Sequence, residues 1–154
     1  MAKLGAEDVE IRVMRESDLG PVTDIDYKVF GQRRPDYYER KIAEVLDEES
    51  GRLVTSLVAE VEGKVAGFIM GSVYLGEFGI PESIAYIDTI GVDPAYQRQG
   101  VAGYLLDEFK STVGKAGVRK VHTLVNWADT DLLSFFADEG FVAANTLNLK
   151  FDLG

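Results

Sequence analysis

The sequence predicts a single domain of the α+β class, close to α/β, built on a mixed sheet of seven strands with helices on both faces. The order of periodicities along the chain runs strand, helix, helix, three strands, helix, strand, helix and two strands. The length of 154 residues fits one domain with its own apolar core, and the chain contains no repeats or linkers. A polar turn at residues 93–100 separates an apolar run from a helical pattern and lies at the centre of this order.

The N-terminal part predicts one strand and two helices. Residues 9–13 alternate apolar and polar side chains, as in a half-buried strand. Ser17 and Asp18 can cap the first helix, and Pro21 falls near its first turn, where a missing N–H is tolerated. Residues 31–35 interrupt the helical pattern. The apolar positions of the two helices are Val22, Ile25 and Val29 in the first and Tyr38, Ile42, Val45 and Leu46 in the second.

The middle of the chain predicts a hairpin and a third strand. Residues 53–62 and 65–75 form two apolar runs around a tight turn at Gly63 and Lys64. A glycine-containing loop at residues 76–83 leads to the strand at residues 84–92.

The strand at residues 84–92 ends where Asp93 and Pro94 begin a turn, because proline cannot donate to a sheet ladder. A helix follows from Gly100, with apolar residues at every fourth position. A helix that starts after such a turn presents free backbone N–H groups and the positive end of its dipole, which together bind anions such as phosphate. An ordinary strand–turn–helix without a ligand is an equally good interpretation of this stretch alone.

The C-terminal part predicts a strand, a helix and two closing strands. Gly117 ends the preceding helix, and residues 118–125 form the strand. Asp129 is a suitable N-cap for a short helix that Gly140 closes. The two closing strands are expected at residues 141–144 and 147–153, where apolar residues alternate.

Composition and charge exclude several classes of function. A formal net charge of −10 argues against nucleic-acid binding and favours cationic partners. The chain has no cysteine, which excludes disulfides, zinc–thiolate sites and a thiol nucleophile. Without a signal peptide or an apolar run long enough to cross a membrane, the protein is expected to be cytoplasmic, with residues 1–8 flexible. The phosphate-loop pattern GxxxxGK[ST] and the dinucleotide pattern GxGxxG are both missing.

With these elements in order, the chain resembles the GNAT superfamily of acetyl-CoA-dependent N-acetyltransferases from about residue 11 to residue 151. Its pyrophosphate pattern is matched by Val92, Gln97, Gly100 and Ala102. Three weaker features follow the same order: residues 11–19, the hairpin at 63–68, and the stretch from Asn126 to Phe141. The resemblance implies a mostly antiparallel GNAT sheet that splays between the fourth and fifth strands.

The resemblance also implies a set of cofactor contacts. Backbone groups of Ile90 and Val92 would hold the pantetheine arm, with a strand N–H near Val92 polarising the acetyl carbonyl and Gly91 forming a bulge. Backbone N–H groups from residue 97 to residue 103 would bind the pyrophosphate; these residues are Gln97, Arg98, Gln99, Gly100, Val101, Ala102 and Gly103. Asn126, Asp129 and Phe136 occupy further cofactor positions of the family.

Asp88 is the candidate general base. It is a carboxylate in an otherwise apolar strand, and the loss of hydration would make it a better proton acceptor. The family often places its base four or six residues before the position of Val92, which here means Asp88 or Tyr86. The alternatives are that Asp88 is purely structural or that it binds the acceptor.

The general acid departs from the family pattern. The frequent tyrosine is replaced by Phe136, so Tyr96 or a water molecule would protonate the leaving thiolate, or the thiolate would leave unassisted. Asp129 replaces a common asparagine and loses its amide donor. The lone His122 is expected to be structural, and no metal is expected because no metal-ligand spacing is present.

The resemblance therefore implies an N-acetyltransferase that transfers an acetyl group from acetyl-CoA to a primary amine by direct attack. The acceptor is expected to be cationic, either a small molecule or a peptide, and the family makes a homodimer plausible. The alternative is a catalytically silent domain that binds CoA or acyl-CoA as a sensor or interaction module.

Overall fold

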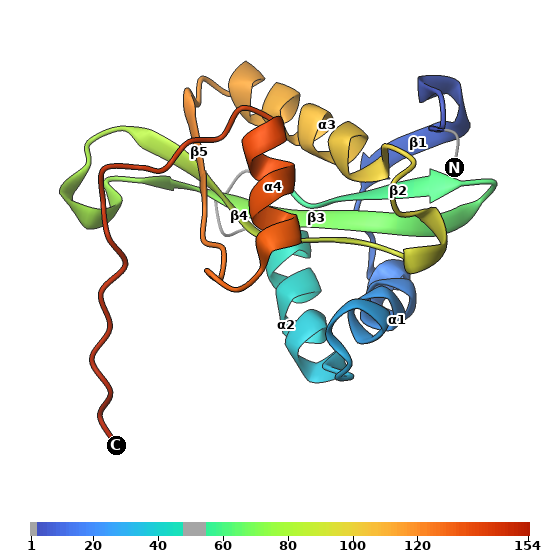
Figure 1. Cartoon of the computed structure of the whole chain (residues 1–154), viewed down its shortest axis with the longest axis horizontal. Helices are drawn as coiled ribbons and strands as arrows, with labels where there is room; N and C mark the ends of the chain where they lie inside the picture. The colour runs from blue at the N-terminus through green and yellow to red at the C-terminus, as the bar shows by residue number, and fades with distance from the viewer. Residues whose placement is uncertain (1–2, 48–54) are drawn as a thin grey trace. The chain divides into compact units, whose positions relative to one another are not determined.

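The computed structural model describes residues 3–47 and 55–154, which fall into two units spanning residues 1–124 and 125–154 (Figure 1). The first unit carries the sheet and three α-helices, and the second carries one α-helix and the C-terminal segment. Among the described residues, none of the helices combines the length and the apolar character needed to cross a membrane.

The first unit contains a sheet of five strands in sequential order. β1 (Val9–Val13), β2 (Leu57–Val61), β3 (Lys64–Leu75) and β4 (Ser83–Val92) pair antiparallel, and β5 (Lys120–Thr123) pairs in parallel with β4. The predicted mixed, mostly antiparallel sheet is confirmed. Residues 53 and 54, where the second strand was expected to begin, lie outside the described residues.

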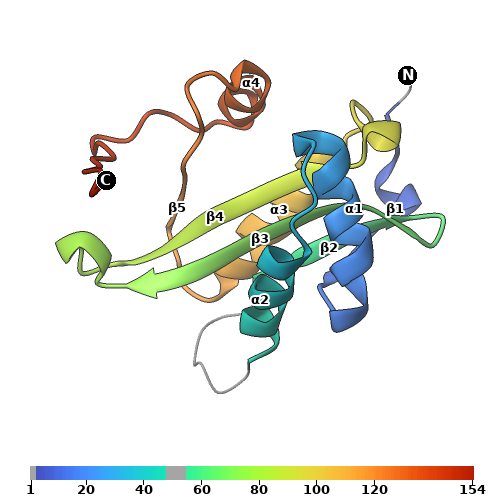
Figure 2. The same cartoon turned by 90° about the horizontal axis from the view of Figure 1, so that it is seen from below.

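Helices cover both faces of this sheet, as predicted. α1 (Leu19–Phe30) and α2 (Pro35–Leu46) lie on one face, and α3 (Val101–Lys115) lies on the other (Figure 2). A Cβ atom added to Gly91 would meet the α1 residue Ile25, whereas one added to Gly67 would meet Leu105 and Val101 of α3. Short 3₁₀ helices connect the elements at Ala6–Asp8, Glu16–Asp18, Glu77–Gly79 and Pro94–Tyr96.

The apolar core lies on both sides of the sheet. On the α1 and α2 side, eight buried residues form one cluster: Met14, Val22, Ile25, Tyr38, Ile42, Val58, Phe68 and Met70. On the other side, α3 buries the apolar face that its periodicity predicted: Val101, Leu105, Leu106, Phe109 and Val113. The sheet is therefore held between two apolar layers, which fixes the path of β4 through the molecule.

Gly71 of β3 lies against both β4 and the α3 residue Phe109. A Cβ atom at Gly71 would lie 2.5 Å from the carbonyl oxygen of Tyr86 and 2.6 Å from the ring of Phe109. We expect Gly71→Ala to lower the free energy of unfolding by about 1–3 kcal/mol, because the backbone of β4 cannot move away cheaply. Gly114→Ala in α3 is the control, since nothing lies within 4 Å of its added Cβ. Urea denaturation of both variants checks this, and equal midpoints would contradict it.

Asp18 is a buried carboxylate at the start of α1. Arg12 donates two hydrogen bonds of 2.8 Å to its two oxygens, and the N–H of Arg15 donates one of 2.7 Å. Burial alone would raise the pKa of Asp18, but the hydrogen bonds from Arg12 and Arg15 outweigh it, so the pKa lies below its ordinary value of 3.8. The network therefore stabilises the folded state only while Asp18 is ionised.

A folded-state pKa below the unfolded value means that this stabilisation is present above pH 3.8 and is lost as the pH falls through the folded pKa. We expect the difference in unfolding free energy between the wild type and Asp18→Asn to be largest near neutral pH and to shrink below pH 3.8. Denaturant titrations at several pH values measure this difference. A difference that does not change with pH would show that the ionised form contributes nothing.

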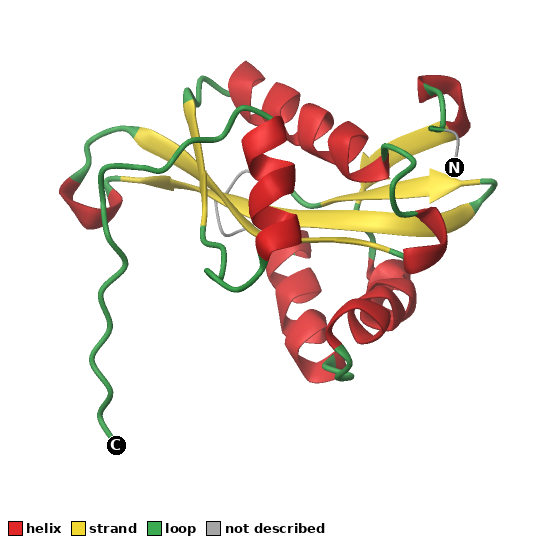
Figure 3. Cartoon of the chain, viewed as in Figure 1, coloured by secondary structure: helices red, strands yellow, loops and turns green. Residues whose placement is uncertain are grey.

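The second unit differs from the sequence prediction. Its helix α4 (Thr130–Asp138) forms as expected, and Asp129 caps it by accepting a 3.1 Å hydrogen bond from the N–H of Leu132. The two closing strands predicted at residues 141–144 and 147–153 were wrong: residues 141–154 form no strand (Figure 3). Their alternating apolar side chains are 84–95 % exposed at Leu147, Leu149, Phe151 and Leu153. Alternating apolar and polar residues suit the two faces of a sheet, but a strand forms only where a neighbouring backbone pairs with it.

Candidate active site

β4 and β5 separate halfway along β4. Their parallel pairing runs from Ile84 with Lys120 to Ile87 with Thr123, and the Thr123 hydroxyl donates a 2.9 Å hydrogen bond to the Ile87 carbonyl at its end. Beyond Ile87, β4 continues for five more residues with β3 on one side only. The predicted splay between the fourth and fifth strands is confirmed. We call the backbone of residues 88–92 on the side away from β3 the open edge of β4.

The direction of the backbone groups on the open edge follows from the register. The N–H of Asp93 donates a 2.8 Å hydrogen bond to the Ala66 carbonyl on β3. Since backbone groups alternate sides along an antiparallel strand, those of Val92 and Ile90 point away from β3. The Gln97 side-chain amide donates a 3.0 Å hydrogen bond to the Val92 carbonyl. The N–H of Val92 and both backbone groups of Ile90 therefore point to the open edge, and their contact with pantetheine stays a prediction.

The irregularity in β4 lies at Asp88 rather than at Gly91. Met70 pairs with Thr89 and Gly71 pairs with Ile87, which leaves Asp88 without a partner in the ladder. Gly91 instead pairs in register with Phe68. A Cβ at Gly91 would lie 2.9 Å from the Phe68 ring, so glycine is required there by packing. The predicted bulge at Gly91 was therefore wrong, and the bulge falls on the candidate base instead.

Asp88 is not the buried carboxylate that the apolar strand predicted. Its side chain is 30 % exposed, and its Oδ2 lies 3.3 Å from the Nζ of Lys41 on α2. Burial lowers the pKa of Lys41, but its interactions with Asp88, Tyr37 and Glu44 together raise the pKa by more, so the ammonium form is favoured. Asp88 thus belongs to an ion pair just beyond the point where β4 and β5 stop pairing, and is not the desolvated carboxylate that was expected. The sequence did not indicate Lys41 as a site residue, because it lies 47 residues from Asp88 and no motif links the two.

Tyr86 lies two residues before Asp88 on β4, and its ring contacts the rings of Tyr74 and His122. Its ring centroid is 5.6 Å from that of Tyr74 and 5.5 Å from that of His122. Tyr86 and His122 are also direct partners in the parallel ladder. This contact gives His122 the packing role that was expected. The second catalytic candidate therefore belongs to an aromatic row, and its role as a base stays a prediction.

The turn after β4 combines a short 3₁₀ helix with left-handed residues and leads into the start of α3. Asp93 Oδ1 accepts a 2.9 Å hydrogen bond from the N–H of Ala95 and starts the 3₁₀ helix that contains Tyr96. Arg98 and Gly100 have left-handed φ values of 65° and 95°, which glycine adopts without strain and arginine does not. α3 begins directly after Gly100, so the N–H groups of its first turn have no carbonyl partner within the helix.

The N-terminal segment contacts this turn. The N–H of Leu4 donates a 2.9 Å hydrogen bond to the Gln99 carbonyl, and the Tyr104 hydroxyl donates one of 2.8 Å to the Leu4 carbonyl. These bonds connect Leu4 to both sides of the start of α3. The flexibility predicted for residues 1–8 stays a prediction, but Leu4 has defined partners.

The remaining predicted cofactor residues, Asn126, Asp129 and Phe136, belong to the second unit, and their roles stay predictions. Asn126 Oδ1 accepts a 2.8 Å hydrogen bond from the N–H of Ala128. Phe136 is 4 % exposed and packs against Phe135 and Phe141, with ring centroids 5.2 Å and 4.9 Å away. Within its unit, Phe136 is thus a packing residue.

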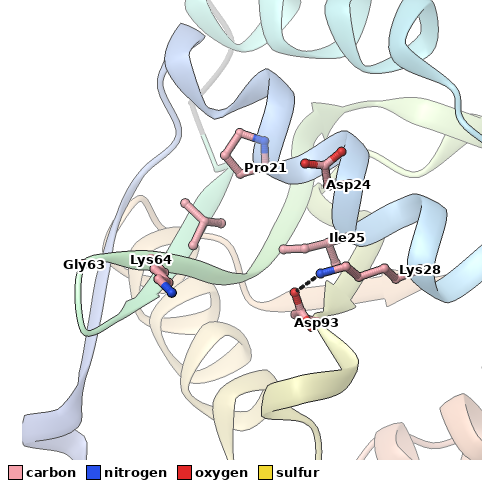
Figure 4. Close-up of a pocket in the computed structure, with 8 residues that line it drawn as sticks. Pro21, Asp24, Ile25, Lys28, Gly63, Lys64 and Asp93 are labelled. Carbon is pink, nitrogen blue, oxygen red and sulfur yellow. Dashed lines mark hydrogen bonds and ion pairs between the residues drawn. The ribbon is translucent and has the colours of Figure 1, made fainter.

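A depression of about 340 Å³ lies beside α1, at the turn between β2 and β3 (Figure 4). In it, Lys28 and Asp93 form an ion pair of 2.8 Å, which holds α1 against the end of β4. None of the residues predicted for catalysis or cofactor binding lines this depression. In residues 3–47 and 55–154, no group of three or more His, Asp or Glu side chains could hold a metal ion.

Comparisons with known proteins found relatives by sequence and by fold. The uncharacterized N-acetyltransferase YjhQ of Escherichia coli is 31 % identical over 94 residues, which cover 59 % of this chain and 49 % of that protein. The chain thus spans about half the length of this curated relative.

Two solved structures are similar over nearly the whole chain. One is aminoglycoside N-acetyltransferase AAC(6')-Iy in complex with CoA, with a TM-score of 0.78, 18 % identity and coverage of 95 % of both chains. The other is a ribosomal-protein-alanine N-acetyltransferase from Brucella melitensis biovar Abortus, with a TM-score of 0.73, 18 % identity and coverage of 95 % and 99 %. At this level of identity the two likenesses concern the fold. Residues 20–141 match the acetyltransferase (GNAT) family, and because this match covers most of the sequence, the chain belongs to the GNAT family.

Proposed function

We propose that the protein transfers an acetyl group from acetyl-CoA to a primary amine by direct attack. The observation that supports this best is the open edge of β4, which leads without a break into the left-handed turn at Arg98 and Gly100 and the start of α3. A strand edge with free N–H and C=O groups suits the amides of pantetheine, and a helix start suits the pyrophosphate. Family membership supports the class of reaction, and this arrangement supports the proposed position of the donor.

The pantetheine arm would pair with Ile90 and with the N–H of Val92, because these groups point away from β3. One of these N–H groups would polarise the acetyl carbonyl and stabilise the oxyanion of the tetrahedral intermediate. The pyrophosphate would accept hydrogen bonds from the backbone of residues 97–103. Gln97 holds the Val92 carbonyl and thereby fixes the strand end against the turn.

Asp88 would accept the proton of the attacking amine, since it lies beside the point where β4 and β5 part. The CoA thiolate would then leave and take a proton from Tyr96 or from solvent. A thiol has an ordinary pKa of about 8.5, so unassisted departure costs little near neutral pH. The net charge of −10 favours a cationic acceptor through long-range attraction. The names of the two similar enzymes also specify amines: an aminoglycoside in one and an alanine of a ribosomal protein in the other.

The direct test measures free thiol released from acetyl-CoA in the presence of a panel of primary amines, with CoA affinity measured separately by calorimetry. Release that depends on both the amine and the protein supports the transferase. CoA binding without release across polyamines, aminoglycosides and N-terminal peptides would instead support the silent CoA-binding domain. Failure to bind CoA would exclude both functions.

The phosphate position predicts the effect of an added charge at the start of α3. Ala102→Glu would place a carboxylate beside the proposed pyrophosphate, whereas Ser111→Glu adds the same charge to an exposed position further along the same helix. We expect Ala102→Glu to weaken CoA binding by about tenfold or more and Ser111→Glu to leave it nearly unchanged. Calorimetric titration with CoA measures both. Equal affinities would move the pyrophosphate away from this turn.

We further propose that two copies associate through the C-terminal segment. Its alternating apolar side chains, from Leu147 to Leu153, are exposed within the chain and would be covered by a second copy. Light scattering on the intact protein should give the mass of a dimer, and Leu149→Lys combined with Phe151→Lys should give a monomer. A wild-type monomer at micromolar concentration would contradict this proposal.

A further inference from the structure

Lys41 brings a primary amine to the carboxylate that we assign as the base. Its Nζ lies 3.3 Å from Asp88 Oδ2, and its side chain is 28 % exposed. An acceptor amine that is deprotonated by Asp88 must place its nitrogen within hydrogen-bond reach of the same oxygens. Lys41 Nζ therefore stands close to the position that the proposed function requires of an acceptor nitrogen.

The position of this pair along β4 supports that comparison. Asp88 follows Ile87, the last residue of β4 that pairs with β5, and it forms the bulge in the ladder with β3. Ile90, whose backbone groups point to the open edge, follows two residues later, a distance of about 7 Å along a strand. The four-carbon side chain of a lysine is long enough to cover such a distance by rotation of its bonds.

The helix that carries Lys41 is well anchored. Next to it on α2, Tyr38 is fully buried and donates a 2.9 Å hydrogen bond to Asp26 of α1. The Nζ of Lys41 also lies 5.8 Å from the centre of the Tyr37 ring. The backbone of α2 thus holds Lys41 at Asp88, while its side chain keeps the freedom of a partly exposed group.

We propose that Lys41 is an internal acceptor, and that acetyl-CoA bound at the open edge acetylates its Nζ in cis when no external amine is present. This inference rests on the proposed function, because it needs acetyl-CoA as the donor. It adds a modification site and a single-turnover reaction to that function.

The reaction balances with the groups present. The Lys41 ammonium transfers one proton to Asp88, and the neutral amine attacks the carbonyl carbon of the thioester. The new C–N bond forms, the C–S bond breaks, and the thiolate leaves with the electron pair of that bond. The nitrogen loses its second proton to solvent. Asp88 gives up its proton through solvent to the thiolate and is ionised again, so the products are N-acetyl-lysine, the free CoA thiol and one released proton.

Acetylation changes the site that carries it. An acetylated Lys41 has no positive charge, so its ion pair with Asp88 is lost. Asp88 then becomes available to the ammonium group of an external acceptor, which no longer competes with Lys41. The internal reaction thus converts a site in which Lys41 occupies Asp88 into one in which an external amine can reach Asp88.

Lys28 provides a matched control within the same chain. It also pairs with a carboxylate, that of Asp93 at 2.8 Å, but its side chain is 51 % exposed and is therefore more accessible to acetyl-CoA from solution. Non-enzymatic acetylation should modify Lys28 at least as fast as Lys41. Acetylation within the site should favour Lys41 by about tenfold or more, because it converts a bimolecular reaction into an intramolecular one.

The experiment incubates the full chain with acetyl-CoA alone and follows acetylation of each lysine by peptide mass spectrometry. We expect one acetyl group at Lys41, at a rate per molecule that does not change with protein concentration. In Asp88→Asn, acetylation at Lys41 should fall to the rate of Lys28. Lys41→Arg keeps the positive charge and should remove the main site of modification without creating another.

The outcomes separate this inference from the proposed function. Acetyl-CoA binding and turnover of an external amine, with Lys41 modified no faster than Lys28, would overturn the internal acceptor alone. Failure to bind acetyl-CoA would overturn both. Acetylation of Lys41 that accelerates with protein concentration would show transfer between molecules and would also overturn the reaction in cis.

Discussion

Replacing Asp26 with alanine is expected to lower the free energy of unfolding by about 3–5 kcal/mol, which is a large part of the stability of a domain of this size. The side chain of Asp26 is fully buried, and Arg34 donates two hydrogen bonds to it, of 2.9 Å and 2.6 Å. Tyr38 donates a third of 2.9 Å. Without the carboxylate, the guanidinium and the buried hydroxyl lose their shared acceptor.

The surroundings of Arg34 increase the cost of losing Asp26. The guanidinium carbon lies 5.3 Å from the ring centre of Phe30 and 5.2 Å from that of Tyr37, so the cation is held between aromatic faces. Burial raises the pKa of the Tyr38 hydroxyl, and its hydrogen bond to Asp26 raises it further, so this hydroxyl stays a donor at any ordinary pH.

Asp24→Ala is the matched control for this prediction. Asp24 lies on the same helix and pairs with Arg33 at 2.9 Å, but the side chains of both Asp24 and Arg33 are more than half exposed. A pair of this kind contributes about 0–1 kcal/mol. Equal losses of stability in Asp26→Ala and Asp24→Ala, measured by urea denaturation, would show that burial of the Asp26 cluster does not matter.

The sequence predicted the parts of the fold that depend on neighbouring residues. The end of β4, the turn and the start of α3 were found because Pro94 and Gly100 act on the backbone within a few residues of their own position. The Asp129 cap was found for the same reason. These features located the end of β4 and the start of α3, while phosphate binding at the turn between them stays a prediction.

Features that depend on partners distant in the sequence could not be predicted in this way. The ion pair between Asp88 and Lys41 joins residues 47 apart, and nothing in either local sequence indicates the other. The burial expected of Asp88 was inferred from its apolar neighbours, but the bulge and the approach of α2 decide its surroundings. The apolar residues at 147–153 alternate as in a strand, but no strand forms there. A strand also needs a neighbouring backbone to pair with.

Asp88→Asn is expected to lower kcat for amine acetylation by about 100- to 10,000-fold while leaving CoA affinity unchanged. Asparagine keeps nearly the same size and can still contact Lys41, but it cannot accept a proton from the attacking amine. CoA affinity should persist, because the groups proposed to bind it are backbone atoms of the open edge and the turn. Thiol release at saturating amine measures kcat, and calorimetry measures binding.

Tyr86→Phe is the comparison that decides between the two base candidates. It removes only the hydroxyl and keeps the ring contacts with Tyr74 and His122, so it should preserve the aromatic row and most of the activity. A large loss in Tyr86→Phe with normal turnover in Asp88→Asn would transfer the role of base to Tyr86. Normal turnover of a verified acceptor by Asp88→Asn at every pH would remove Asp88 from the mechanism. The ion pair with Lys41 bears on this comparison, because Asp88 can accept a proton from an external amine only after Lys41 has moved away or has lost its charge by acetylation.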